Sequence, residues 1–192
     1  MEMTHDKTRR LVLGALMAAL VFVGSWARIT LPIAIAGNTA FHLGNIMCAL
    51  SGILLGPVGG GLASAVGSAL FDMTNPLYLS ECWITFLTKG LYGVVAGLIA
   101  WSGGRRGESL PRNAAATVAA AVAYAVVYLA KSFFYNGLLV DGLTAQAAAL
   151  TVVAKLPATI FNAVVAIVCA PLLAKAIERA LKRAGLGGDP AA

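Results

Sequence analysis

Residues 41–90 decide the fold: FHLGNIMCALSGILLGPVGGGLASAVGSALFDMTNPLYLSECWITFLTKG. This stretch is strongly apolar, and the pair Gly56-Pro57 divides it into two segments. A turn this short leaves no room for a soluble domain, so the two apolar segments must double back on each other. Polar side chains inside such segments destabilise the protein in the membrane unless they pair with one another or take part in a functional site. Several nevertheless occur here: His42, Asn45, Ser64, Ser68, Asp72, Asn75, Glu81 and Lys89.

The composition of the whole chain is that of an integral membrane protein. Of its 192 residues, 59% are hydrophobic and 11% are charged, and the mean hydropathy is +0.84. Soluble domains carry about 25% charged residues. We therefore expect a single membrane domain over residues 1–192, embedded in a lipid bilayer. The net charge of +6 comes from basic clusters between apolar segments, which indicates a topology signal and not a nucleic-acid partner.

The hydropathy pattern predicts an all-α, polytopic protein with six transmembrane helices. A helix that crosses a bilayer needs about 20 apolar residues, and tilted or buried helices can be shorter. A loop with Pro32, Gly37 and Asn38 is expected after the first helix, and residues 177–192 are expected to be a basic tail. The six predicted helices lie at about 10–29, 41–55, 58–73, 82–101, 113–136 and 147–176.

The basic residues predict the orientation. Lysine and arginine accumulate on the cytoplasmic side of membrane proteins. Ten of the fourteen basic residues fall on one side of the predicted topology: Lys7, Arg9, Arg10, Arg105, Arg106, Arg112, Lys175, Arg179, Lys182 and Arg183. Both termini are therefore expected in the cytoplasm, and the chain is expected to be a multi-pass protein of a prokaryotic plasma membrane.

Polar residues recur at intervals of four along the predicted helices, so each set lines one helix face. Ser64, Ser68 and Asp72 form one such stripe, and Thr85 and Lys89 belong to another. Lys89 lies about 10 Å below the outer end of its helix at 1.5 Å per residue. The inner halves of the helices consist mostly of Ala, Val, Leu and Gly. A channel would need polar groups through the full depth of the membrane. The pattern therefore favours a pocket that opens outward and is sealed on the inner side.

The candidate substrate-binding residues are the polar groups that share this depth, with the last two expected at the rim: Asp72, Glu81, Lys89, Tyr128, Lys131, Lys155, Asn162, His42 and Asn45. Structural alternatives stay open for them. A lysine can extend its ammonium to the headgroups, a carboxylate can be interfacial or pair with a lysine, and tyrosines can simply pack. The sequence shows no metal-ligand pattern, and the three cysteines are interpreted as small packing residues. We expect no cofactor, no metal and no catalytic residue.

The segments HLGN, LLGP, VGGGLASAVGSALFD and WITFLTKGLYGVVAG resemble the S components of energy-coupling-factor (ECF) vitamin transporters, closest to the riboflavin and hydroxymethylpyrimidine type. The resemblance covers residues 10–176. It implies a membrane subunit that captures a water-soluble vitamin or precursor near the outer face. It also implies partners, namely a coupling transmembrane subunit and two cytoplasmic ATPases. Ala15 and Ala19 form an Ala-xxx-Ala pattern like the one that docks on the coupling subunit in this family, so the resemblance implies a docking role for them.

Two other classes of function remain open. An intramembrane serine protease would need a nucleophile and a base, and Ser64, Ser68 and His42 are available, but no GxSxG motif occurs. A self-sufficient carrier usually shows two repeated halves, and none is found here. The chain also has no P-loop, so we expect it to be no ATPase and no enzyme. Pantothenate, folate, riboflavin and pyrimidine or thiamine precursors are all candidate substrates.

Overall fold

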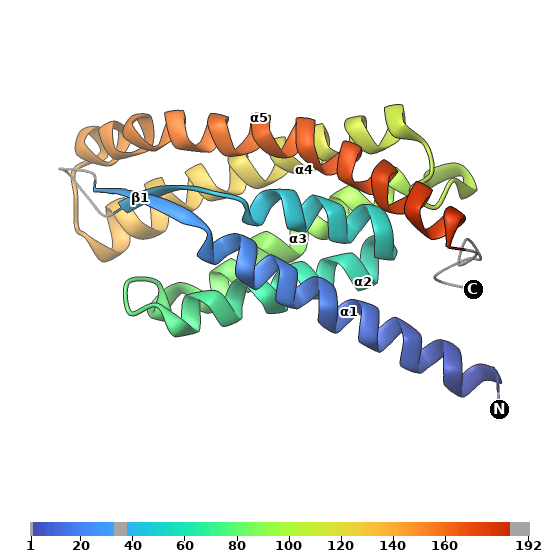
Figure 1. Cartoon of the computed structure of the whole chain (residues 1–192). Coiled ribbons are helices and arrows are strands. Elements are labelled where there is room, and N and C mark those ends of the chain that lie inside the picture. The colour runs from blue at the N-terminus through green and yellow to red at the C-terminus, as the bar shows by residue number, and fades with distance from the viewer. Residues whose placement is uncertain (1, 33–37, 185–192) are drawn as a thin grey trace.

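The computed structural model describes residues 2–32 and 38–184. It is a bundle of long helices with one β-hairpin at one end (Figure 1). The elements, in chain order, are α1 (Glu2–Trp26), β1 (Arg28–Pro32), β2 (Asn38–His42), α2 (Gly44–Thr74), the 3-10 turn η1 (Leu79–Glu81), α3 (Cys82–Ala100), the 3-10 turn η2 (Ser102–Gly104), α4 (Leu110–Lys131), the π-helix η3 (Ser132–Val140) and α5 (Ala145–Arg183).

The helices have the length and composition of membrane spans. Among the described residues, five helical stretches are long and apolar enough to cross a bilayer. Many of their large hydrophobic side chains point outward, as expected for contact with lipid; Leu11 on α1, for example, is 74% exposed. The predicted all-α membrane class is therefore confirmed. The five stretches are 7–26, 44–74, 79–100, 110–140 and 145–183.

Helix α2 is not straight, because it reverses at Gly56. This residue has φ 74° and ψ −175°, a conformation open to glycine but strained for other residues. Pro57 follows and has no N–H group to donate to the carbonyl of Ile53, four residues earlier. The indole N–H of Trp101 donates to that carbonyl instead, at 2.8 Å. The turn is therefore both permitted by its sequence and completed by a side chain from the end of α3.

The two arms of α2, residues 44–55 and 57–74, run antiparallel (Figure 1). The hydroxyl of Ser64 donates to the carbonyl of Cys48 at 3.3 Å, and the Sγ of Cys48 lies 3.9 Å from the Oγ of Ser68. In a straight helix, residues 16 apart would be separated by about 24 Å. The single stretch 44–74 thus forms a helical hairpin.

Glycines allow the α2 hairpin and α3 to touch through their backbones. A Cβ atom on Gly60 would overlap the backbone of Gly52, and one on Gly93 would overlap the carbonyl oxygen of Gly60. Gly97 approaches Pro57 in the same way. Lipid provides no hydrophobic force between helices, so close packing of small residues holds such bundles together. We refer to Gly52, Gly60 and Gly93 as the glycine seam, because a Cβ atom on any of them would overlap a neighbouring backbone.

Alanines continue this packing toward the other helices. Ala96 on α3, Ala120 on α4 and Ala166 on α5 are fully buried in one core cluster with Ala49 of α2. Helix α1 joins the bundle through the buried side chains of Met17 and Val21 and by close approach to Gly67 of α2. The N-terminal half of α1 extends away from the other helices (Figure 1).

The structure corrects the prediction for residues 27–42. The first helix ends at Trp26 and not near residue 29, and an antiparallel hairpin replaces the expected loop. Arg28 pairs with His42, and Pro32 pairs with Asn38. The segments Arg28–Pro32 and Asn38–His42 are too short and too polar to cross a bilayer, but they can satisfy each other's backbone groups as strands. The expected loop residue Gly37 lies outside the described residues.

The predicted ends of the last helix are also wrong. Helix α5 begins at Ala145, where the hydroxyl of Thr144 accepts a hydrogen bond from the N–H of Ala147 at 3.3 Å. It continues to Arg183, well into the predicted tail 177–192. Glu178 pairs with Lys175 and Lys182 at 2.8 and 2.6 Å, which supports the extra helical turns. Residues 185–192 of that tail lie outside the described part of the chain.

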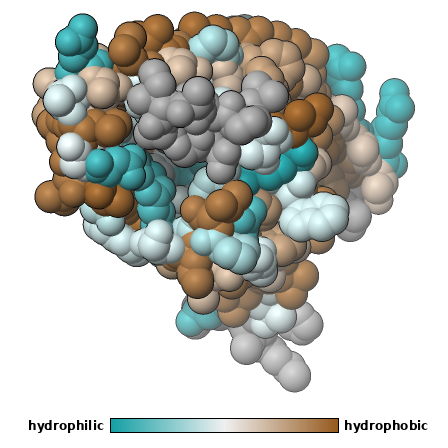
Figure 2. Space-filling view, turned by 90° about the vertical axis from the view of Figure 1, so that its left-hand side faces the viewer, coloured by the Kyte–Doolittle hydropathy of each residue, from teal (hydrophilic) through white to brown (hydrophobic). Residues whose placement is uncertain are grey.

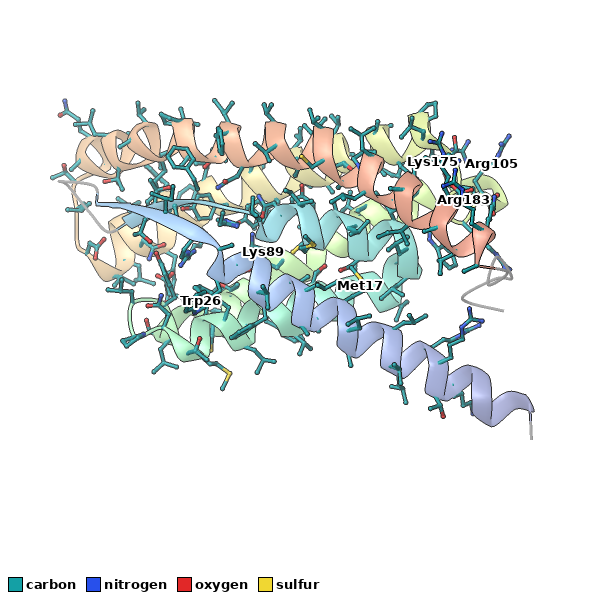
Figure 3. The ribbon with its side chains drawn as sticks, in the orientation of Figure 1. Met17, Trp26, Lys89, Arg105, Lys175 and Arg183 are labelled. Atoms are coloured by element: carbon teal, nitrogen blue, oxygen red, sulfur yellow. The ribbon has the colours of Figure 1, made fainter. Side chains whose placement is uncertain are left out.

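The two ends of the bundle differ in charge. The start of α1 and the end of α5 lie at one end, and the β-hairpin and the loop before α3 lie at the other (Figure 1). Figure 3 places Arg105, Lys175 and Arg183 together at the first of these ends. These three residues belong to the basic set that the sequence assigned to one side, and the structure places them at one end of the fold.

The glycine seam generates a testable prediction. Replacing Gly60 by Ala should destabilise the protein by about 1–3 kcal/mol, because the added methyl group overlaps the backbone of Gly52. The measurement is a thermal unfolding curve of the detergent-purified protein. Gly14→Ala is the matched control, since nothing lies within 4 Å of a Cβ there. If the two variants melt at the same temperature, the arms of α2 are not in backbone contact.

Candidate functional site

A cavity of about 290 Å³ lies at the end of the bundle that carries the β-hairpin. Its walls come from the hairpin, from the adjoining ends of α2 to α5 and from the loop before α3. Figure 2 looks onto this end and shows hydrophilic residues gathered in the middle of the face, with hydrophobic residues around them. The cavity is therefore a polar site set in an apolar bundle.

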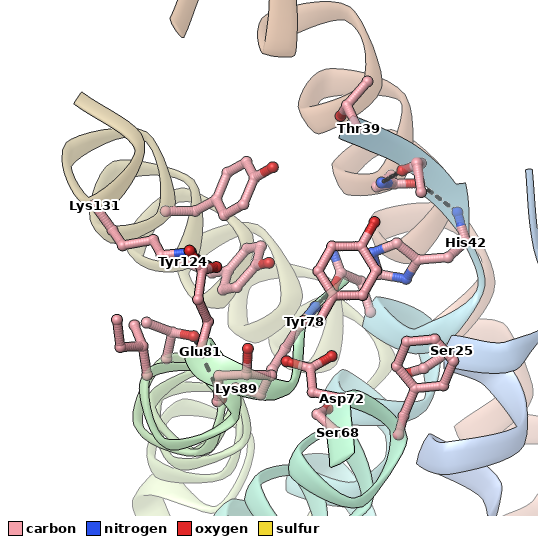
Figure 4. Close-up of a pocket in the computed structure, with 18 of the residues that line it drawn as sticks. Ser25, Thr39, His42, Ser68, Asp72, Tyr78, Glu81, Lys89, Tyr124 and Lys131 are labelled. Atoms are coloured by element: carbon pink, nitrogen blue, oxygen red, sulfur yellow. Dashed lines mark hydrogen bonds and ion pairs between the residues drawn. The ribbon is translucent and has the colours of Figure 1, made fainter. Parts of the chain in front are cut away.

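The structure brings all nine predicted substrate-binding residues to this one cavity. They come from β2, α2, η1, α3, α4 and α5, so distant parts of the chain meet here (Figure 4). Their contact with a substrate stays a prediction. The nine residues are His42, Asn45, Asp72, Glu81, Lys89, Tyr128, Lys131, Lys155 and Asn162.

Lys89 lies in the wall of the cavity with neutral partners. Its side chain is only 6% exposed, and its ammonium donates a hydrogen bond to Oδ1 of Asn45. The same nitrogen lies 4.2 Å from the centre of the Tyr124 ring, where a cation–π interaction is favourable. Asn45 is itself buried, so it belongs to the wall and not to the expected rim. Lys89 thus points inward and does not extend to the membrane surface.

Lys131 has a carboxylate partner. Its ammonium forms an ion pair with Oε2 of Glu81, and the side-chain amide of Asn136 donates to Oε1 of the same carboxylate. Both charged side chains are largely buried, at 16% and 19% exposed. The pairing ties η1 to the α4–η3 helix and neutralises one positive charge of the cavity.

Lys155 resembles Lys89 in having no carboxylate partner. It is 7% exposed, and its ammonium donates to the hydroxyl of Ser132 at 3.3 Å. The ring of Tyr128 lies 6.0 Å from the same nitrogen. Ser132 is the first residue of the π-helix η3, and π-helical turns are frequent at functional sites.

Asn162 fastens the β-hairpin to α5. Its Oδ1 accepts a hydrogen bond from the backbone N–H of His42 at 3.0 Å, and its Nδ2 donates to the carbonyl of Ala40 at 2.8 Å. The Nδ1 of His42 accepts from the N–H of Gly44 at 3.1 Å, and the ring points into the cavity (Figure 4). The hairpin is therefore held over the site by side-chain to backbone bonds.

Sequence reasoning missed Arg28 as a site residue. Its guanidinium lies over the rings of Phe71 and Tyr78, 4.5 and 4.8 Å from their centres. Its Nε and Nη1 are buried and have no hydrogen-bond partner. The available signal was that Arg28 is an isolated basic residue on the outer side of the predicted topology. The predicted set of site residues also did not include Tyr124. This residue lines the cavity and stacks on Tyr128, with the ring centres 5.7 Å apart.

The site has the chemistry of a binding pocket. Within residues 2–32 and 38–184, no group of three or more His, Cys, Asp or Glu side chains could hold a metal ion. Ammonium, guanidinium, amide, hydroxyl and phenol groups surround the space, and aromatic rings form part of its wall. Such a mixture of fixed polar groups and rings is typical of pockets that recognise small molecules.

Comparison with known proteins agrees with this description. The chain is 40% identical over 70 residues to a Pyrococcus woesei protein described as "Uncharacterized protein in gap 3'region". That alignment covers 36% of this chain and 44% of the relative, so the match spans less than half of either protein. Residues 5–179 match the model of the family described as ECF-type riboflavin transporter, S component. The chain therefore belongs to this family, whose members are substrate-binding subunits of membrane transporters and not enzymes.

Proposed function

We propose that this chain is the substrate-capture subunit of an ECF-type importer. In this function it binds a water-soluble vitamin or vitamin precursor in the cavity near the outer face. A coupling transmembrane subunit and two cytoplasmic ATPases then drive its delivery. The observation that carries the proposal is the polar cavity at one end of an apolar bundle, in a chain of this family.

The proposed topology has six spans in a prokaryotic plasma membrane. The spans are α1, the two arms of α2, α3, α4 with η3, and α5. Arg105, Lys175 and Arg183 lie at the end opposite the cavity, and a basic end is typically cytoplasmic (Figure 3). Both termini are then cytoplasmic, and the cavity opens toward the outside.

The distribution of polar groups supports capture without independent transport. Below Lys89, the bundle is filled by buried residues such as Tyr92, Ala96 and Ala49. A channel would need polar groups along its whole length. A site that is closed on the inner side must be opened by a partner or by a large rearrangement, and the sequence contains no P-loop to provide the energy.

Two measurements test the capture function. Protein purified from cells grown in rich medium should retain a small organic molecule, which mass spectrometry of the extracted protein identifies. Proteoliposomes that contain this chain alone should bind that molecule but not accumulate it. Accumulation by the chain alone would instead identify a self-sufficient carrier.

Lys89 is the strongest candidate for direct contact with the substrate. Loss of a charge-assisted hydrogen bond costs about 1.5–3 kcal/mol, so Lys89→Ala should weaken binding roughly tenfold or more. Ligand titration in detergent measures this effect, and a melting curve separates lost contact from misfolding. Lys182→Ala is the matched control, because that side chain is 54% exposed and lies on the cytoplasmic extension of α5.

Lys131→Ala and Lys155→Ala belong in the same titration series. Lys131 forms an ion pair with Glu81, so Lys131→Ala should lower the stability of the folded protein more than Lys155→Ala does. If all three lysine variants bind as the parent does, the substrate lies elsewhere.

Ala15 and Ala19 are proposed to dock on the coupling subunit. Both are exposed on α1, on a face away from the buried Met17 and Val21. Small residues four apart let another helix approach closely. Ala15→Trp or Ala19→Trp should therefore leave substrate binding unchanged and reduce uptake in cells that carry the complete importer.

Ala149→Trp provides the control for docking, since Ala149 is an exposed alanine on α5. The control variant should support normal uptake. The docking proposal fails if the α1 variants transport normally, or if they lose binding while still folding as the parent does.

A further inference from the structure

We propose that the substrate is an organic anion, a small molecule with at least one carboxylate or phosphate group that Lys89, Lys155 and Arg28 neutralise. This inference rests on the proposed capture function and names the substrate class of that same site. It follows from the balance of charges around the cavity and from which of those charges already have partners.

The cavity carries more positive than negative charge. Its lining contains two carboxylates, Asp72 and Glu81. Even if both are counted as fully charged, the ammonium and guanidinium groups leave an excess of two positive charges. The four basic lining residues are Arg28, Lys89, Lys131 and Lys155.

The ion pairs among the lining residues show which positive charges have no counter-charge in contact. Both carboxylate oxygens of Glu81 already have partners, because one pairs with Lys131 and the other accepts a hydrogen bond from Asn136. Among the described residues, ion pairs within 4.0 Å join Lys131 to Glu81 and two lysines to Glu178, and neither Lys89 nor Lys155 takes part in one. Both of these lysines are more than nine-tenths buried.

The partners of these two lysines are neutral. Lys89 donates to the amide oxygen of Asn45, and Lys155 donates to the hydroxyl of Ser132. An ammonium carries three N–H donors, so each of these groups retains the capacity to bind a further acceptor. A buried ammonium without a counter-ion is costly in an apolar bundle. A bound anion would remove that cost, and a neutral compound would not.

Arg28 provides a third donor group of the same kind. Its Nε and Nη1 are buried without a hydrogen-bond partner, although the rings of Phe71 and Tyr78 stabilise the cation. Guanidinium groups form strong charge-assisted hydrogen bonds with carboxylate and phosphate oxygens, and these two donors are available for such bonds. Arg28 lies on β1 and Lys155 on α5, so an anion bound by both would also bridge the hairpin to the bundle.

The size of the cavity limits the substrate further. A volume of about 290 Å³ is at the small end of the range of about 300–1,000 Å³ that is typical of ligand pockets. The offset rings of Tyr124 and Tyr128 lie at one side of this space, with an interplanar angle of 15°. A compact anion fits these features, whereas riboflavin, which gives the family its name, is uncharged at neutral pH.

The test compares pairs of compounds in which one member is an anion and the other is a neutral relative. The probes are nicotinate with nicotinamide, pantothenate with pantothenol, and riboflavin 5'-phosphate with riboflavin, together with the molecule that co-purifies with the protein. The co-purified molecule should be an anion at pH 7. Any probe pair that binds should show at least about tenfold tighter binding of its anionic member, the change expected for one charge-assisted bond.

Variants separate a charge effect from a general loss of the site. Lys89→Gln and Lys155→Gln keep a polar side chain of similar length, so each should weaken binding of the anion about tenfold and leave that of the neutral compound nearly unchanged. Lys182→Gln, at the opposite end of the bundle, should change neither. Equal losses for anionic and neutral compounds would overturn the inference, because the lysines would then act only on the shape of the pocket.

The remaining outcomes are also decisive. A co-purified ligand that is neutral or cationic would overturn the anion proposal while supporting the capture function. Stabilisation of the protein by chloride or inorganic phosphate as large as that by any organic anion would overturn it too, because a simple inorganic ion would then be the counter-ion. If no organic molecule co-purifies and no probe binds, the capture function itself fails.

Discussion

The backbone contact between Gly52, Gly60 and Gly93 is the constraint on which the rest of the structure depends. In lipid, helices gain little from burying apolar surface, so they associate where small residues let their backbones meet. The reversal at Gly56 brings the two arms of α2 together, and the glycine seam then fixes α3 against both arms. This contact sets the rotation of α3, and the rotation decides which of its side chains face the interior.

The positions of the residues that line the cavity follow from that rotation. Lys89 lies one turn before Gly93 on α3, and Asn45 lies about two turns before Gly52 on α2, so the seam places both on the same inner face. Above this level, helices α4 and α5 contribute their own lysines, and Asn162 binds the backbone of the β-hairpin over the opening. The tight packing at the glycine seam thus positions the side chains that line the cavity at the hairpin end of the bundle.

The charges of the cavity are only partly balanced by the protein. The pair of Lys131 and Glu81 is internal and joins two elements, so it serves the structure first. The ammonium groups of Lys89 and Lys155 donate hydrogen bonds to neutral partners, Asn45 and Ser132. Buried charge is destabilising unless it is compensated. The uncompensated positive charge of the cavity therefore lowers the stability of the empty protein, and in the function that we propose a bound substrate restores it.

The sequence by itself determined the membrane class, the break at Gly56-Pro57 and the polar residues that meet in one cavity, because composition, turn residues and helical periodicity are local properties. The nine predicted residues, with His42 and Asn45 expected at the rim, do line one cavity. Only the tertiary structure decided that residues 28–42 form a hairpin, that Glu81 pairs with Lys131 and not with Lys89, and that Arg28 and Tyr124 belong to the cavity. These features depend on how helices are rotated and on which neighbours they meet, and periodicity along one segment carries no information about contacts between segments.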